Sequence, residues 1–190
     1  MNILDNAKGE LISWDDPLLT SPQEEWDFKK YPLEEAAKLG LLLIETSKKL
    51  NGAGLSANQI GLPYKVFVLT AEETFDLPSM ALFNPEILES SEDTNIMTEG
   101  CLSRPNLWLL VKRPTVIKVK YQTFKGEEIK TTLNGYLSRV FQHEYDHMLG
   151  IDFTQRVSRE KLKRAIKKQK KDAKRGRTTS ILRGNFTDSL

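Results

Sequence analysis

Apolar residues recur three and four positions apart between residues 32 and 50, and this spacing predicts an amphipathic helix. The helix is expected to begin at Pro32, because proline is favoured in a first helical turn. It is expected to end at Asn51-Gly52, a typical stop signal. Its apolar face comprises Leu33, Ala36, Ala37, Leu41, Ile44 and Leu50.

Two further helices are predicted in the second half of the chain. One opens at Asn134 or Gly135 and ends near Gly150, where glycine favours termination. Ser158 is a suitable N-cap for the other, whose apolar stripe is narrow. The face of the first carries Leu137, Val140, Phe141 and Glu144, and the stripe of the second consists of Leu162, Ala165 and Ile166.

Strands are indicated by short runs rich in apolar, β-branched and aromatic residues. These runs are residues 65–70, 81–88, 107–111, 116–124 and 127–133. The second run is expected to break at Pro85, and the last two form a hairpin across Lys125-Gly126. Small residues at 52–61 indicate a loop. The predicted class is α+β: short antiparallel strands packed around a central helix, with an N-terminal helix and a basic C-terminal helix.

Composition fits a soluble protein whose 190 residues are 39% hydrophobic and 28% charged. The longest apolar run, residues 39–44, is far shorter than a membrane span, so no membrane association is expected. The first residues lack the basic-then-apolar pattern of a secretory signal and are too acidic for a transit peptide, so neither is expected. With Cys101 as the single cysteine, no intramolecular disulfide is possible, and a cytoplasmic location is expected.

Both histidines of the chain lie in His143-Glu144-Tyr145-Asp146-His147. Residues four apart on a helix project from the same face, so the two imidazoles can hold one metal ion. Glu144, beside the first of them, can handle protons at a metal-bound water. The pattern therefore predicts a metallohydrolase.

A third protein ligand is needed, because catalytic sites of this kind usually supply three. A metzincin would need histidine at position 153, which is Phe153. A thermolysin-like downstream glutamate is not favoured, since the only glutamate after the motif is Glu160, close behind it at the start of the basic tail. Cys101 remains, with Gly100 beside it to let the backbone approach an ion. The alternative for Cys101 is a buried, inert thiol.

Three motifs in order resemble those of the peptide deformylase family. Residues 52–59 (GAGLSANQ) are similar to its Gly-x-Gly-Leu-Ala-Ala-x-Gln loop. Residues 99–103 (EGCLS) match its second motif without change, and residues 142–147 (QHEYDH) match Gln-His-Glu-x-Asp-His. The resemblance covers roughly residues 30–155, and three motifs in order are far more specific than any one.

The resemblance implies removal of the N-terminal formyl group from nascent polypeptides that begin with formyl-methionine. It implies that Cys101, His143 and His147 bind the metal and that Glu144 carries the proton. By family analogy, the side-chain amide of Gln59 and the backbone N–H of Leu102 stabilise the oxyanion.

Substrate contacts are expected from two places. The extended peptide is expected to pair with the loop Gly52-Ala53-Gly54 and with the segment after Ser103, and Glu99 is assigned to substrate binding. The formyl-methionine side chain needs an apolar pocket, whose predicted wall is the helical turn before the ligands. That wall comprises Tyr136, Arg139 and Val140.

Support for the histidines is expected from Asp146, which lies between them. The resemblance implies that Arg113 pairs with it, because the family carries an arginine there; the alternative is that both side chains are solvated. Three residues depart from the family pattern: Ser56 replaces the first alanine of the loop motif, Arg104 replaces an aliphatic residue, and Trp108 lies where a basic residue is common. None of them removes a catalytic group.

One divalent metal ion is expected. The resemblance implies Fe(II), while the same ligands accept zinc, nickel or cobalt. A thiolate beside Fe(II) would make the enzyme sensitive to oxygen.

Charge divides the chain into a predicted catalytic domain, residues 1–157, and a basic helix with a flexible tail, residues 158–190. Residues 151–190 carry a net charge of +9 and residues 1–150 a net charge of −7. The segment 158–177 holds eleven Lys/Arg and two acidic residues. It is either a solvated helix face or a contact to ribosomal RNA. No DNA partner is expected.

Two other functions stay open from the residues alone. One is a metallopeptidase with a Cys-His-His site, although such enzymes do not need the Gln59 loop or the EGCLS motif. The other is a non-catalytic ribosome-binding protein, which would have no use for Glu144 beside the ligands.

Overall fold

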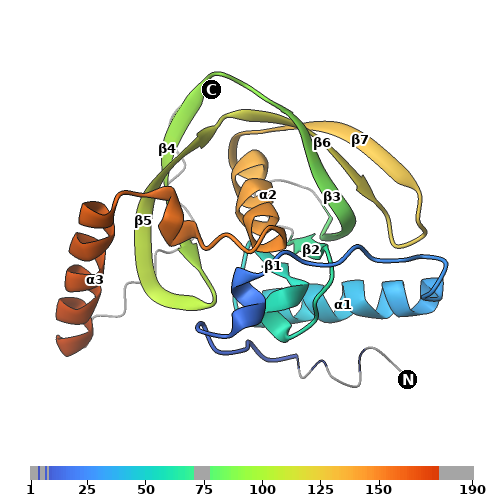
Figure 1. Cartoon of the computed structure of the whole chain (residues 1–190), viewed down its shortest axis with the longest axis horizontal. Coiled ribbons are helices and arrows are strands. Elements are labelled where there is room, and N and C mark those ends of the chain that lie inside the picture. Colours follow the sequence, from blue (N-terminus) through green and yellow to red (C-terminus); the bar gives the residue numbers. More distant parts are fainter. Residues whose placement is uncertain (1–3, 5–6, 8, 71–77, 176–190) are drawn as a thin grey trace.

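The computed structural model describes residues 4, 7, 9–70 and 78–175. Figure 1 shows helix α2 at the centre, between a hairpin on one side and a larger sheet on the other. Within these residues the elements are α1 (Leu33–Lys49), β1 (Gly54–Ser56), β2 (Val66–Leu69), β3 (Met80–Ser90), β4 (Thr94–Cys101), β5 (Arg104–Pro114), β6 (Val116–Gln122), β7 (Glu128–Asn134), α2 (Gly135–Met148) and α3 (Arg159–Lys174), with short 3-10 helices η2 (Pro17–Thr20), η3 (Ala57–Ile60) and η4 (Phe153–Arg156). The predicted α+β class is confirmed.

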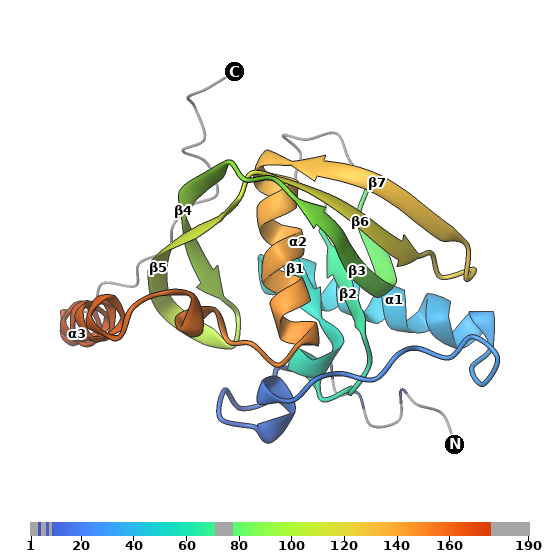
Figure 2. The ribbon, with the colours of Figure 1, turned by 45° about the horizontal axis from the view of Figure 1, so that its top comes forward.

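Two antiparallel sheets surround α2. In the described part of the chain, the larger sheet has five strands in the order β1-β2-β3-β6-β7, and β4 and β5 form a separate hairpin. Helix α2 contacts strands of both, and Figure 2 shows it standing between them. The expected hairpin of β6 and β7 is present, with Gly126 at a φ of 80° in its turn.

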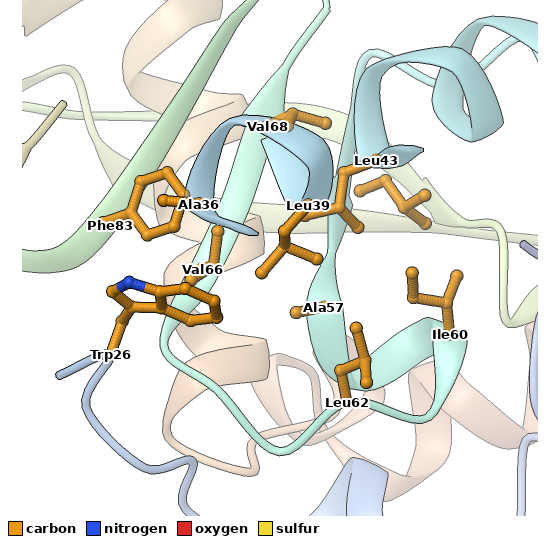
Figure 3. Close-up of a cluster of buried hydrophobic side chains, with 11 residues drawn as sticks. Trp26, Ala36, Leu39, Leu43, Ala57, Ile60, Leu62, Val66, Val68 and Phe83 are labelled. Atoms are coloured by element: carbon orange, nitrogen blue, oxygen red, sulfur yellow. The ribbon is translucent and has the colours of Figure 1, made fainter. Parts of the chain in front are cut away.

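Strand β2 is apolar at every position because both of its faces are buried. Successive side chains of a strand point to opposite faces, so a strand covered on both sides must be apolar throughout. Val66 and Val68 pack with α1 in the cluster of Figure 3, which also includes Trp26 and Phe83. Phe67 and Leu69 lie on the other face, in a second cluster with residues of α2 that include Phe141 and Met148.

Two strand predictions are wrong, the break at Pro85 and the bounds of the strand at 107–111, and one strand was missed. Pro85 does not break its strand, because β3 runs through it from Met80 to Ser90. A shift in the pairing with β6 between Phe83 and Glu86 accommodates the missing N–H. Asn84 adopts a φ of 49° there, and its side chain bonds the backbone of Trp26 in both directions, at 2.7 and 2.9 Å. Strand β4 was not predicted at all, and β5 extends well beyond residues 107–111.

The predicted loop at 52–61 is more ordered than its small residues indicate. It contains β1, which pairs with β2, and the short helix η3. Ser56 and Gln59 form a capping box at the start of η3. The Ser56 side chain accepts from the backbone N–H of Gln59, and the Gln59 side chain accepts from the backbone N–H of Ser56. The loop is therefore fixed directly beneath α2, which it contacts through β1.

Helix α3 lies against β5 at the edge of the molecule (Figure 1). Ser158 caps it as predicted, and its apolar stripe joins a cluster with Leu107, Leu109, Val111 and Phe153. The division of the chain at residue 157 stays a prediction. The basic segment beyond Arg175 and the flexible tail lie outside the described residues. None of the helices in the described ranges has the length and apolarity to cross a bilayer.

Candidate metal centre

Three side chains converge between α2 and the β4–β5 hairpin. Cys101 ends β4, and His143 and His147 lie one turn apart on α2. One ligand atom from each lies within 4.8 Å of the other two, and Cys101 Sγ is 3.3 Å from His147 Nε2. These separations suit one ion with ligand bonds of about 2.0–2.3 Å. The donor set of one thiolate and two imidazoles fits a single divalent ion such as zinc or iron.

The charges of the ligands favour this use. Burial raises the pKa of the Cys101 thiol, but the two histidines outweigh it and bring the pKa down to about 6. Burial lowers the pKa of His143, but Cys101 and Glu99 outweigh it and raise the pKa well above its ordinary value. In the metal-free site the thiol is thus disposed to be a thiolate, the form that binds a metal.

Glu99 holds the first histidine. Its Oε2 is 3.1 Å from His143 Nδ1, which leaves Nε2 of that ring for an ion. Arg113 Nε and the second terminal nitrogen of Arg113 donate to the same carboxylate at 2.7 and 2.9 Å. Burial raises the pKa of Glu99, but Arg113 and His143 outweigh it and hold the pKa well below its usual range.

The predicted pair of Asp146 and Arg113 is present, at 2.7 Å between two residues that are each 4% exposed at the side chain. Arg113 therefore bridges two carboxylates, Glu99 and Asp146. Arg156 also pairs with Asp146 from η4. The cluster joins α2 to the β4–β5 hairpin, so it sets the separation between the histidines and Cys101.

Two residues assigned to the substrate lie elsewhere. Glu99 is buried, and its oxygens accept from Arg113, Arg139 and His143. Arg139 donates to Glu99 at 2.8 Å, to the backbone of Val111 at 3.0 Å and to Asn95. The reason is burial: a guanidinium on this face of α2 needs anionic and carbonyl partners, and β4 and β5 supply them.

The side chain of Glu144 extends from α2 to β1. Its Oε2 accepts a hydrogen bond of 2.6 Å from the Ser56 hydroxyl. Its Oε1 lies against Gly54, where a Cβ would come within 2.7 Å. Gly54 is thus a position where the backbone approaches another group closely, and that group is the Glu144 carboxylate. Glu144 is 4% exposed, beside the ligands and not among them.

Gln59 faces the same centre from η3. Its Oε1 accepts from the backbone N–H of Ser56 at 3.0 Å, which directs Nε2 away from β1. Nε2 donates to Ser103 Oγ at 3.0 Å and lies 3.5 Å from Cys101 Sγ. Leu102 follows Cys101 in the hairpin turn, and its side chain lies over Gly52, where a Cβ would come within 2.8 Å.

A mainly apolar pocket of about 240 Å³ lies between α2 and the larger sheet. Tyr136 and Val140 line it as predicted, together with Ala53 and Leu137, which the pocket prediction omitted. Val140 lies one turn before Glu144, so the pocket adjoins the metal centre along α2. Its volume is below the roughly 300–1,000 Å³ of pockets for drug-sized ligands, and suits a single side chain.

The other departures from the family pattern have structural partners. Arg104 pairs with Asp152 at 2.7 Å and stacks 4.5 Å from the Trp14 ring. The Trp108 ring covers Gly100, where a Cβ would come within 2.5 Å of it. Phe153, at the position where a metzincin has a ligand, packs its ring 5.6 Å from that of His143.

Sequence reasoning missed the contact of Glu99 with His143, although a signal was present. Glu99 stands two residues from Cys101, so a contact with the same site could be expected, although a register shift between Gly100 and Cys101 interrupts the strand alternation there. The bonds from Ser56 to Glu144 and from Asn58 Nδ2 to the His147 carbonyl, at 3.0 Å, join segments about 90 residues apart. No local pattern announces them.

A histidine pair on a helix, a cysteine from a facing hairpin and a buried carboxylate beside them define a mononuclear metallohydrolase. The family model described as polypeptide deformylase matches residues 9–163. The peptide deformylase of Thermotoga petrophila is 41% identical over 116 residues, 61% of this chain and 68% of that protein. The one of Bartonella tribocorum is 35% identical over 169 residues, 85% of this chain and 93% of that protein.

Solved structures agree. The inhibitor complex of Arabidopsis thaliana peptide deformylase 1B superimposes with a TM-score of 0.77 at 29% identity, covering 91% of this chain and 98% of that one. The chain belongs to the polypeptide deformylase family, as the three motifs predicted. It is a hydrolase that removes the N-terminal formyl group from nascent polypeptides with a single metal ion, and the Cys101-His143-His147 cluster is a group of side chains that could hold such an ion.

Proposed function

We propose that deformylation proceeds at an ion held by Cys101, His143 and His147, with Glu144 as the proton carrier. The observation that carries this proposal is the convergence of the three ligand atoms within 4.8 Å, beside a buried carboxylate that is not a ligand. The ion would polarise the formyl carbonyl and activate the attacking water. Glu144 would accept a proton from that water and pass it to the leaving amine.

Gln59 and Leu102 are the proposed oxyanion donors. Gln59 Nε2 already points to the ligand cluster, because Ser56 fixes the other end of the amide. The Leu102 N–H belongs to the residue directly after the ligand Cys101. Donors placed where negative charge develops typically stabilise the transition state by roughly 2.7–4 kcal/mol each.

The substrate is proposed to lie extended beside β1, with its backbone against Gly52-Ala53-Gly54. The methionine side chain would enter the pocket lined by Ala53, Tyr136 and Val140. The mainly apolar lining and the modest volume favour a single apolar side chain there. Arg139 is not proposed as part of this pocket, since its guanidinium is bound to Glu99.

The native metal is proposed to be Fe(II), because the set of one cysteine and two histidines accepts it and the family resemblance implies it. The same atoms accept zinc, nickel or cobalt, and affinity alone does not select among them. Protein prepared without oxygen and loaded with Fe(II) should turn over faster than a zinc-loaded sample. Exposure to air should then remove this advantage, since the thiolate and Fe(II) both oxidise.

Formate release from formyl-Met-Ala-Ser tests the proposal. Fe(II)-loaded protein should release formate, whereas Glu144→Ala should lose nearly all turnover and keep its metal, because Glu144 is not a ligand. Absence of formate from the wild-type protein would end the proposal. Full activity of Glu144→Ala would remove that carboxylate from the mechanism.

Gln59→Leu tests the oxyanion role. We expect a fall of about 10²–10³ in kcat with metal still bound, the range typical of losing one donor. Gln155→Leu, at an exposed position on η4, is the matched control and should leave kcat unchanged. Equal turnover of the two variants would exclude Gln59 as a donor.

We also propose that α3 contacts ribosomal RNA, where the substrate emerges, and that the protein works in the cytoplasm with those ribosomes. The apolar stripe of α3 faces β5, whereas every Lys and Arg between residues 159 and 174 is exposed. Cations left free on one side of a docked helix suit phosphate contacts. Aromatic residues for base stacking are absent from α3, so a backbone contact is favoured.

Ribosome co-sedimentation tests this contact. The triple variant Arg164→Gln, Lys168→Gln, Lys171→Gln removes three charges from the side of α3 opposite its apolar stripe, so docking on β5 is preserved. Lys118→Gln with Lys130→Gln, on exposed strand positions, is the control. Recovery should fall for the α3 variant alone, and wild-type recovery should fall steeply with salt. Equal, salt-insensitive recovery would refute the contact.

A further inference from the structure

Ser56 carries a hydroxyl where the family motif has alanine. The residue is fully buried at the end of β1, and its Oγ lies 2.6 Å from Glu144 Oε2. A hydroxyl that donates to a carboxylate at this distance makes a charge-assisted hydrogen bond, which is about twice as strong as a neutral one. The same Oγ is 3.4 Å from the Glu144 backbone carbonyl, and in the capping box of η3 it also accepts from the backbone N–H of Gln59.

The backbone of Ser56 contacts the second group of the proposed mechanism. Its N–H donates to Gln59 Oε1 at 3.0 Å, and this bond directs Gln59 Nε2 toward the ligand cluster. Any residue at position 56 can supply that N–H. The bond to Glu144 is different, because it needs the hydroxyl and an alanine cannot make it.

The hydrogen bond from Ser56 restricts the conformation of a flexible Glu144 side chain. That side chain has three rotatable bonds, and in the described part of the chain Ser56 is the residue whose side chain bonds the carboxylate. The other carboxylate oxygen, Oε1, packs against the backbone of Gly54, where a Cβ would lie 2.7 Å from it. Ser56 therefore holds Oε2, while Oε1, beside Gly54, accepts no side-chain hydrogen bond within the described residues and can exchange a proton.

We propose that Ser56 is a positioning residue that fixes the rotamer of the Glu144 carboxylate, so that Oε1 meets the reacting atoms in each turnover. The proposal rests on the proposed role of Glu144. It predicts that removal of the hydroxyl slows the catalytic step without weakening substrate binding, because the substrate contacts are made by other residues. The metal should stay bound, since the side-chain hydrogen bonds of Ser56 in the described residues go to Glu144 and Gln59, neither of which is a ligand.

Kinetics of Ser56→Ala in the Fe(II)-loaded protein test the effect on catalysis. We expect kcat to fall about tenfold, KM to stay within twofold and the metal stoichiometry to be unchanged. Ser138→Ala is the matched control, because Ser138 is also a fully buried serine and its hydroxyl accepts from Gln142 at 2.9 Å. Its kcat should equal that of the wild type. An unchanged kcat in Ser56→Ala, or a fall matched by metal loss, would overturn the proposal.

Thermal unfolding supplies a measurement that does not depend on turnover. Ser56→Ala should lower the Tm in the wild-type background and lower it much less in the Glu144→Ala background, where the carboxylate is already gone. Equal Tm shifts in the two backgrounds would show that the hydroxyl and the carboxylate do not interact. If wild-type protein released no formate, the proposed function would fail, whereas this cycle would still decide whether Ser56 holds Glu144.

Discussion

Arg113 is the residue whose loss should be felt most strongly by both the fold and the metal centre. It is 4% exposed, and its guanidinium donates to Glu99 at 2.7 and 2.9 Å and to Asp146 at 2.7 Å. Arg113→Met keeps the apolar stem and leaves two buried carboxylates without their shared cation. Removing one partner of a buried ion pair typically destabilises a protein by about 3–5 kcal/mol. Because Arg139 and Arg156 remain beside the carboxylates, we expect about 3 kcal/mol.

Urea unfolding of zinc-loaded proteins, at one fixed free zinc concentration, measures this loss. Lys118→Met is the control, because it breaks the pair of Lys118 and Glu89, 2.8 Å apart and more than half exposed on both sides. Exposed pairs contribute little, so this variant should stay within about 0.5 kcal/mol of wild type. The Arg113 variant should also release zinc faster to a chelator, since Glu99 holds His143.

The two results refute different parts of the reasoning. A loss below about 1 kcal/mol in Arg113→Met would mean that the neighbouring arginines compensate fully, so that Arg113 does not hold the cluster together. A large loss of stability with an unchanged rate of zinc release would separate the cluster from the metal ligands.

Three further predictions concern the centre itself. In chelator-treated protein, the rate of Cys101 alkylation should be half-maximal near pH 6, whereas an ordinary cysteine reaches this point near its pKa of about 8.5. Metal loading should suppress the alkylation. Intact mass spectrometry measures it directly, since the chain has one cysteine. Gly54→Ala should reduce turnover at least tenfold in the formate assay, because its Cβ would displace the Glu144 carboxylate. Gly100→Ala should lower the urea midpoint and move the fluorescence of Trp108, whose ring occupies the space of the new Cβ.

The sequence was most informative where the site depends on one helix. His143 and His147 could be placed together from their spacing alone, because a helix fixes which residues share a face. The pairing of Asp146 with Arg113 was also predicted, from the resemblance. Cys101 was harder to assign, since no helical spacing relates His143 to a residue 42 positions before it, outside the helix. It entered as the thiol that remained after other third ligands were excluded.

The limits of prediction are clearest at Arg139. Helix periodicity places Arg139 near Tyr136 and Val140, and so it was assigned to the same pocket wall. The structure separates them around the circumference of α2: Tyr136 and Val140 line the pocket, whereas Arg139 turns to Glu99 and Asn95. The decisive partners lie about 40 residues away on β4, and β4 itself was not predicted.

Strand β4 was missed because its pattern is inverted. In an ordinary half-buried strand the apolar residues face inward, yet here Ile96 is 60% exposed while Asn95 and Glu99 face α2. The inversion follows from what α2 presents on this side, which is Arg139 and His143 in place of an apolar surface. A strand that must pair with a guanidinium and an imidazole needs carboxylate and amide groups on its inner face. Cys101 follows Glu99 by two residues, across a register shift between Gly100 and Cys101, so the end of one strand presents both a candidate metal ligand and the residue that orients another.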